Sequence, residues 1–140
     1  MWKRNRISRI EQLPLFADCT PRELARIEKL MTAQKIPAGT VLCHEGLPGR
    51  ECFIIESGVA QVSIDGQSRA TLMRGSVIGE MALLDGGSRS ATVVAETDMW
   101  VYTMDAAAFA TMLEGFPIVA RRIMKEMSER LRHVVAVAEN

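Results

Sequence analysis

The segment 78–91 combines residue types that could hold an anion beside a sugar. It opens with Gly79 and Glu80, continues through a short apolar stretch, and closes with Arg89 after a Gly-Gly bend. Arginine suits a phosphate because its planar guanidinium can meet two oxygens at once. A carboxylate repels phosphate, but it can accept a hydrogen bond from a sugar hydroxyl. The pattern therefore indicates a site with a phosphate end and a sugar end.

Backbone N–H groups could complete the anion site. Met81 and Ala82 begin the apolar stretch, which we expect to be a short helical segment whose N-terminus favours an anion. The preceding Gly79 lets a ligand approach the backbone closely. Ser90 can add a hydroxyl donor, and Ala91 leaves room for its own N–H to reach the anion.

Length and charge limit the class of protein. The chain has 140 residues, enough for one domain, and its 17 Lys and Arg residues balance 17 Asp and Glu residues. A net charge of zero gives no electrostatic reason to bind nucleic acid directly or to bind an anionic membrane surface. The apolar runs are too short to span a bilayer, and the basic N-terminus has no signal core after it. We expect a cytoplasmic protein in which Cys19, Cys43 and Cys52 are buried free thiols.

Helices are predicted at both ends of the chain. Thr20 and Glu23 form a capping box around Pro21, and apolar residues then recur at helical spacing, which predicts N-terminal helices within residues 1–33. Asp105 is a candidate N-cap for the C-terminal helices in residues 105–140. Their last helix should start at Pro117. One apolar stripe runs along this helix: Ile123, Met127, Leu131, Val134 and Ala138.

The middle of the chain, residues 34–104, has the pattern of a small β-roll. Short β-prone runs are separated by glycines, and Ala60, Val62 and Ile64 alternate with polar residues. Asp65-Gly66 predicts a tight hairpin. The predicted fold class is α+β: one domain over residues 1–140, in which an antiparallel, jelly-roll-like β-roll is flanked by helices.

These features together resemble the cyclic nucleotide-binding domain family, which includes catabolite activator proteins, regulatory subunits of protein kinase A and cyclic nucleotide-gated channels. The resemblance covers roughly residues 13–135, and segment 78–91 corresponds to the phosphate-binding cassette of the family. It implies that Gly79 and Glu80 contact a ribose and that Arg89 contacts the phosphate, with Met81, Ala82, Ser90 and Ala91 completing the cradle. Other segments fit as well: 37–42, Glu45-Gly46, 53–58 and the helical tail.

The sequence departs from the family pattern at two positions. Ile78 stands where the family usually has an aromatic residue, and Ser88 stands where a proline is frequent. We interpret Ile78 as a packing substitution. Ser88 removes a rigid residue just before Arg89, which is expected to loosen the loop and weaken affinity. Neither change removes a group that the resemblance places on the ligand.

The resemblance implies cyclic AMP as the ligand, with cyclic GMP as the alternative. Members that prefer cyclic GMP often carry threonine after the arginine, and Ser90 also has a hydroxyl, so this position separates the two only weakly. The purine is usually capped from the last helix. Arg130, His133 and Val134 are candidates for this cap from their helix positions.

Other interpretations of these residues are weaker. An isolated Glu80–Arg89 pair could be an ordinary surface salt bridge. A cupin-type metal site would need several histidines close together, but His44 is the one histidine in the predicted β region. We expect no metal and no catalytic activity. The predicted function is a regulatory sensor whose C-terminal helix moves on ligand binding.

The predicted sensor is either a stand-alone protein or a domain excised from a larger one, such as an ion channel or another signalling protein. Its partner would be an effector protein or domain, or a second copy bound through the C-terminal helix. The alternative is a dimerisation or interaction module that has kept the fold but binds no nucleotide.

Overall fold

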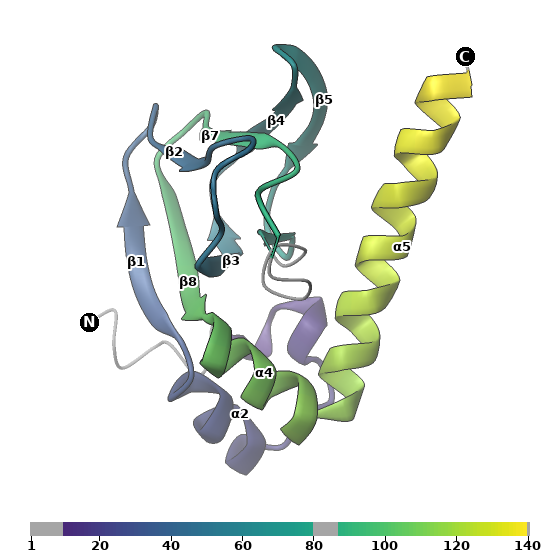
Figure 1. Ribbon diagram of the computed structural model, residues 1–140. Coiled ribbons are helices and arrows are strands. Elements are labelled where there is room, and N and C mark those ends of the chain that lie inside the picture. Colours follow the sequence, from purple (N-terminus) through teal and green to yellow (C-terminus); the bar gives the residue numbers. More distant parts are fainter. Residues whose placement is uncertain (1–9, 80–86, 140) are drawn as a thin grey trace.

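The computed structural model describes residues 10–79 and 87–139, with only the backbone described for Leu131 and for residues 133–139. It confirms the predicted α+β class. Eight described strands form two four-stranded antiparallel sheets, and the helices α2 and α4 lie together at one end of them (Figure 1). Helix α5 leaves that end and runs along the side opposite β1. None of the described helices is long and apolar enough to cross a membrane.

The two sheets exchange strands along the chain, as expected for a roll. The first sheet has the order β1-β8-β3-β6 and the second has the order β2-β7-β4-β5. The strands are β1 (Thr32–Ile36), β2 (Val41–Cys43), β3 (Glu51–Ser57), β4 (Ala60–Ile64), β5 (Gln67–Leu72), β6 (Val77–Ile78), β7 (Thr92–Ala95) and β8 (Met99–Asp105). The predicted hairpin joins β4 to β5 through Asp65 and Gly66, both at positive φ, as a tight hairpin turn requires.

Strand β3 divides the core into two parts. Cys52 and Ile54 pack in a cluster under the helices, whereas Phe53 and Ile55 pack in a second cluster between the sheets. Successive side chains in a strand point to opposite faces, so a strand that is buried on both faces needs a continuous apolar run. This is why residues 52–55 show no alternation of polar and apolar types.

The N-terminal helix forms where its capping box predicts it. Helix α2 (Pro21–Glu28) follows a 3₁₀ turn, η2 (Pro14–Phe16), and it buries Leu24 and Ile27. The Thr20 N–H donates to Glu23 Oε1 over 2.8 Å, and the Glu23 N–H donates to Thr20 Oγ1 over 3.1 Å. The predicted boundary of the roll is wrong by a small margin. The roll was expected to start at residue 34, but α2 ends early and β1 already begins at Thr32.

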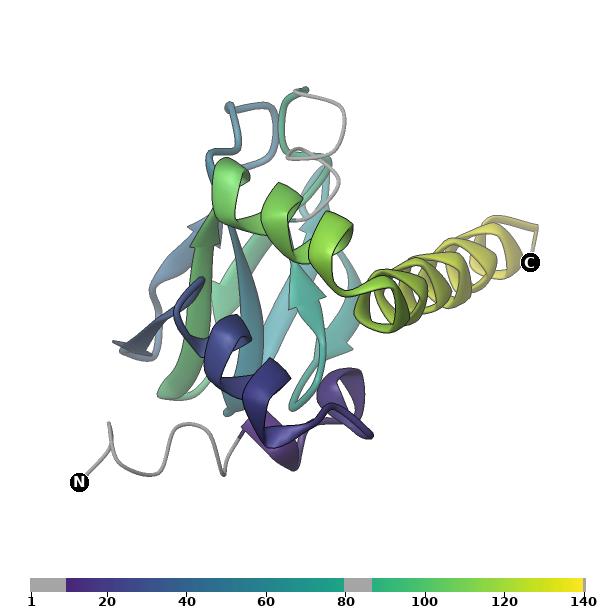
Figure 2. The ribbon, with the colours of Figure 1, turned by 90° about the horizontal axis from the view of Figure 1, so that it is seen from below.

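The C-terminal helices also start at the predicted residues. Asp105 caps α4 (Ala106–Gly115) by accepting a hydrogen bond from the Ala108 N–H over 2.8 Å, and α5 (Pro117–Glu139) begins at the proline. The view from below shows α5 extending away from the roll (Figure 2). Its stripe begins with Ile123, which is buried in the core beneath the helices, and Met127, which packs against that core. The first two residues of the apolar stripe therefore pack against the core of the domain.

The cysteines are free, as predicted, but they are not equally buried. Cys43 and Cys52 lie in the core, whereas Cys19 is half-buried, which corrects the expectation for that thiol. Desolvation and the nearby Glu23 carboxylate raise the pKa of Cys19.

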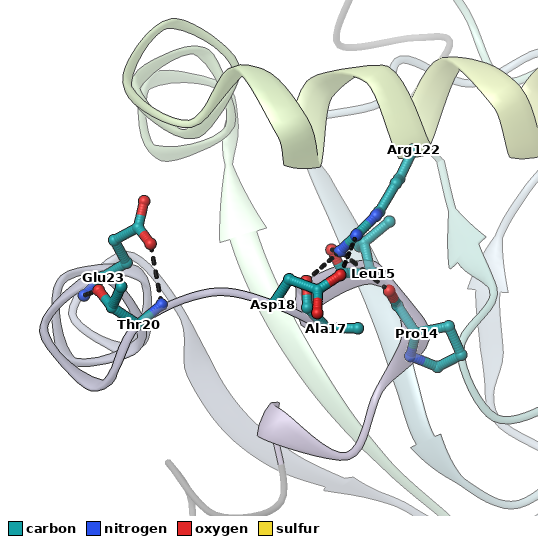
Figure 3. Close-up of polar contacts among 7 residues, drawn as sticks. All are labelled: Pro14, Leu15, Ala17, Asp18, Thr20, Glu23 and Arg122. Carbon is teal, nitrogen blue, oxygen red and sulfur yellow. Dashed lines mark hydrogen bonds and ion pairs between the residues drawn. The ribbon is translucent and has the colours of Figure 1, made fainter.

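Arg122 joins α5 to the N-terminal segment, as Figure 3 shows. Its Nη1 donates to the carbonyl oxygens of Pro14 (3.3 Å), Leu15 (3.2 Å) and Ala17, and its Nη2 pairs with Asp18 over 3.2 Å. The Asp18 side chain is 81% exposed, so water screens the ion pair. The carbonyl contacts matter more, because they supply a donor to the Leu15 and Ala17 oxygens near the end of η2, whereas the Pro14 oxygen also accepts from the Ala17 N–H over 3.3 Å.

Replacing Arg122 should loosen this junction. We expect Arg122→Met to lower the free energy of unfolding by about 1–3 kcal/mol, because it removes the Arg122 donor from the Leu15 and Ala17 carbonyls. The exposed neighbour Arg121 is the matched control, and Arg121→Met should stay within about 0.5 kcal/mol of the parent protein. Urea unfolding of both variants measures the difference. Equal stabilities would contradict the structural role of Arg122.

Candidate functional site

A cavity of about 1090 Å³ lies between α5 and the second sheet, and most of its lining side chains are apolar. The sheet contributes residues from β2, β7, β4 and β5, β6 contributes Ile78, and α5 contributes residues from Ala120 to Arg130. The volume is at the upper end of the range for small-molecule sites. The few polar groups on its wall are therefore candidates for orienting a ligand.

Arg89 is a buried cation on this wall. Its side chain is 8% exposed. Its Nη1 donates to the Gly79 carbonyl oxygen over 3.0 Å, and its Nη2 donates to the Glu51 carbonyl oxygen over 2.7 Å. No carboxylate in the described part of the chain forms an ion pair with it. A guanidinium has five N–H donors, and the bonds to residues in the described ranges 10–79 and 87–139 use two of them.

The backbone of Arg89 is held by the loop between β2 and β3. The Arg89 N–H donates to the Leu47 carbonyl oxygen over 2.8 Å, and the Gly46 N–H donates to the Arg89 carbonyl oxygen over 2.9 Å. One residue earlier, Ser88 pairs with Pro48 in an isolated β-bridge. Residues 88 and 89 are thus held by residues 46–48, and the expectation that Ser88 loosens the loop and weakens affinity stays a prediction.

Position 79 requires a glycine for two separate reasons. Its φ of +86° lies in the left-handed region, and a Cβ built on it would overlap Arg89 Nη1 and lie 3.1 Å from the Glu51 carbonyl oxygen. The left-handed region penalises side chains. The missing side chain is also the space that the guanidinium occupies, so Gly79 and Arg89 depend on each other.

Helix α5 is tied to the strand that leads into Gly79. Glu126 Oε1 accepts a hydrogen bond from the Val77 N–H over 3.1 Å, which links the middle of α5 to the start of β6. Ile123, one turn earlier, is 1% exposed and fixes the helix against the core. Both contacts lie at the cavity, so the position of α5 and the position of the segment that ends at Gly79 are coupled.

The structure brings together four of the residues that the sequence predicted for the ligand. Gly79, Arg89, Ser90 and Ala91 all line the cavity, although they come from both ends of the 78–91 segment. Glu80, Met81 and Ala82 lie outside the described residues, so their predicted roles stay predictions.

The predicted purine cap is placed only in part. Arg130 is half-buried and lines the cavity from α5. His133 and Val134 follow it along the same helix, but only their backbone is described. The capping role of all three stays a prediction.

Sequence reasoning missed three charged residues that line the cavity: Arg69, Glu126 and Glu129. Glu126 lies off the apolar stripe of α5 and therefore looks like a solvated position. Arg69 lies in a short polar stretch after a hairpin, and no spacing rule distinguishes it from an exposed strand residue. Within residues 10–79 and 87–139, no group of His, Cys, Asp and Glu side chains has the three members that could hold a metal ion.

Fold and site together define a domain with a β-roll, a long C-terminal helix and a cavity between them whose wall carries the buried cation of Arg89. The family model of the cyclic nucleotide-binding domain matches residues 33–116, and the chain belongs to this family. The sequence-based assignment to the family is therefore confirmed.

Similar proteins come from several functional settings. A cAMP-dependent protein kinase regulatory subunit of Hypocrea atroviridis is 34% identical over 113 residues, covering 81% of this chain and 24% of that protein. A cyclic nucleotide-gated potassium channel of Mesorhizobium japonicum is 34% identical over 121 residues, covering 86% of this chain and 34% of the channel. The solved structure of Thermus thermophilus catabolite activator protein has a TM-score of 0.76 at 27% identity, covering 90% of this chain and 62% of that one.

Adding a side chain at Gly79 should disturb the anion site more than adding one at a comparable glycine. We expect Gly79→Ala to lower the free energy of unfolding by more than the roughly 1–2 kcal/mol that left-handed backbone costs an alanine, because Arg89 must also move. Gly46 is the matched control, since its φ of +84° is similar and nothing lies within 4 Å of the place that a Cβ would take there. Chemical denaturation of both alanine variants measures this. A smaller loss at Gly79 than at Gly46 would contradict the packing argument.

Proposed function

We propose that this domain binds a cyclic purine nucleotide and that Arg89 holds its phosphate. The observation that carries the proposal is the buried guanidinium of Arg89, which has two carbonyl partners and no described carboxylate partner. A buried charge is costly unless it is compensated. Carbonyl dipoles compensate it in part, and a phosphate oxygen would do so with a full charge and a charge-assisted hydrogen bond.

The rest of the cavity suits a purine. Val62, Ile64 and Leu72 from the sheet and Met127 from α5 face the space next to Arg89, Ser90 and Ala91. An apolar wall with a few convergent polar groups is the usual form of a small-molecule site. The names of the two relatives refer to cAMP and to cyclic nucleotides, which supports the same class of ligand here. We take cyclic AMP as the sequence-based expectation and cyclic GMP as its alternative.

Arg89 variants test the phosphate assignment. Calorimetric titration of the refolded, ligand-stripped protein should give saturable binding of cyclic AMP or cyclic GMP and much weaker binding of 5′-AMP. Arg89→Ala should cost about 2–3 kcal/mol of binding free energy, or about 30–150-fold in affinity, because it removes charge-assisted hydrogen bonds. Arg89→Lys keeps the charge but lacks the planar guanidinium. Its affinity should lie between those of the parent protein and Arg89→Ala.

The stability of each variant is measured beside its affinity, because Arg89 also bonds to the protein backbone. An unchanged dissociation constant in a folded Arg89→Ala protein would refute the assignment. No heat with any nucleotide in the parent protein would favour the alternative of a nucleotide-free dimerisation module.

We also propose that ligand binding shifts the position of α5, so that the domain acts as a regulatory sensor and catalyses no reaction. Glu126 joins α5 to β6 just before Gly79, and Arg122 joins the start of the same helix to the N-terminal segment. A ligand that draws the segment 78–91 inward would act on the Glu126 contact, which lies at Val77 just before that segment. Since a ligand shifts only an equilibrium between states that it binds differently, the contact of α5 with the purine must supply that difference.

A distance measurement across the cavity tests this movement. Spin labels on cysteines introduced at the exposed positions Ser68 in β5 and Arg132 in α5, in a Cys19→Ser background, report the gap between sheet and helix. Saturating nucleotide should shorten the distance between them. A control pair at the exposed Gln34 in β1 and Ser68, both in the roll, should not change. An unchanged distance between positions 68 and 132 at saturation would rule out the proposed movement.

The chain spans about a quarter to a third of the two relatives, so the activity that the sensor controls is not carried over from them. The effector, the homodimer through α5 and the cytoplasmic location stay predictions from the sequence.

A further inference from the structure

Glu45 directly precedes the two residues that hold the backbone of Arg89. The N–H of Gly46 donates to the Arg89 carbonyl oxygen, and the N–H of Arg89 donates to the Leu47 carbonyl oxygen. Gly46 and Leu47 belong to the loop 44–50, in which no residue is buried. Because burial does not fix this loop, its polar contacts with other segments decide how firmly Arg89 is held.

Two hydrogen bonds at Glu45 join the loop to the rest of the roll. Its backbone N–H donates to Thr92 Oγ1 over 3.1 Å, at the first residue of β7. Its side chain accepts a hydrogen bond at Oε1 from the Asp65 N–H over 3.0 Å, in the turn between β4 and β5. The loop is therefore held by two segments that are distant from it in sequence, a strand and a hairpin turn.

The contact with Asp65 links the loop to a wall of the cavity. The carboxylate of Glu45 gives the Asp65 N–H a charged acceptor, and such a hydrogen bond is stronger than one between neutral groups. The hairpin on either side of this turn contributes Ile64 and Ala70 to the cavity wall. Glu45 thus connects a hairpin that forms part of the cavity with the loop that holds Arg89.

We propose that Glu45 is a positioning residue for the phosphate site. Neither Glu45 nor Thr92 is among the described residues that line the cavity, so both act on a ligand through the residues that they hold. A group that binds a ligand must be kept within about 0.5 Å of its productive position. Loss of the Glu45 contacts would release the loop 44–50 and widen the range of positions that the Arg89 guanidinium takes. The inference rests on the proposed binding of a nucleotide phosphate by Arg89.

Calorimetric titration of variants of the whole chain with cyclic AMP and cyclic GMP tests this role. Glu45→Ala should weaken binding by about 3–10-fold, which corresponds to the loss of one hydrogen bond. Glu45→Gln keeps an oxygen acceptor and should recover most of the affinity. Thr92→Val releases the backbone N–H of residue 45 with little change in side-chain shape and should weaken binding in the same direction. This variant decides the test if Glu45→Ala does not fold.

Asp98 offers a matched control. Its Oδ1 accepts a hydrogen bond from the Ala38 N–H over 2.9 Å, so it also joins two turns through a carboxylate and a backbone donor, and neither residue is among the described cavity lining. Asp98→Ala should lower the stability in urea about as much as Glu45→Ala does and leave the affinity for nucleotide unchanged. A Glu45 with a purely structural role would behave in the same way as Asp98.

A double-mutant cycle shows whether Glu45 acts through Arg89. In the Arg89→Ala protein, Glu45→Ala should change the affinity by less than about 2-fold, because the group that Glu45 positions is already absent. Equal losses in the two backgrounds would place the effect of Glu45 elsewhere and overturn the inference, while the proposed function would stand.

The remaining outcomes also separate the inference from the proposed function. An unchanged affinity in a folded Glu45→Ala protein would overturn the inference alone. Absence of nucleotide binding in the parent protein would overturn the proposed function, and the inference with it.

Discussion

The structure of the candidate site depends on one constraint, which is that the charge of Arg89 is buried and must be compensated. Two backbone carbonyls do this in part, one at Gly79 and one at Glu51. They belong to segments far apart in the sequence, and the guanidinium holds them together. The missing side chain at Gly79 follows from the same constraint, since any Cβ there would enter the space of the guanidinium. The loop 44–50 then fixes the backbone of Arg89 through Gly46 and Leu47.

Helix α5 converts this anion site into a cavity. The sheet alone would leave Arg89, Ser90 and Ala91 on an open surface, whereas α5 adds a second wall with Ile123 and Met127. Two long-range polar contacts position the helix, one from Arg122 to η2 and one from Glu126 to β6. Both contacts lie in the first half of α5. Such an arrangement suits a sensor, because the same helix closes the site and can carry the signal away from it.

Local signals in the sequence predicted most of the framework. The capping box at Thr20, the N-cap at Asp105, the helix start at Pro117 and the hairpin at Asp65-Gly66 are all present, because each is satisfied by groups within a few residues of the chain. The start of β1 was placed too late for a related reason. Thr32 and Ala33 become strand residues through pairing with Thr103 and Tyr102 in β8, and nothing local marks that partner.

The sequence by itself determined the fold class and the family, and it pointed to candidate ligand-binding residues because segment 78–91 carries them in a continuous stretch. Only the tertiary structure decided what surrounds them. The Glu51 carbonyl, the Glu126 contact with Val77 and the position of Arg69 arise from strand pairing and helix packing between residues that are distant in sequence. Arg69 is the clearest case. Its residue type is visible in the sequence, but its place at the cavity depends on the pairing of β5 with β4 and on the packing of α5 across them, which no local pattern marks.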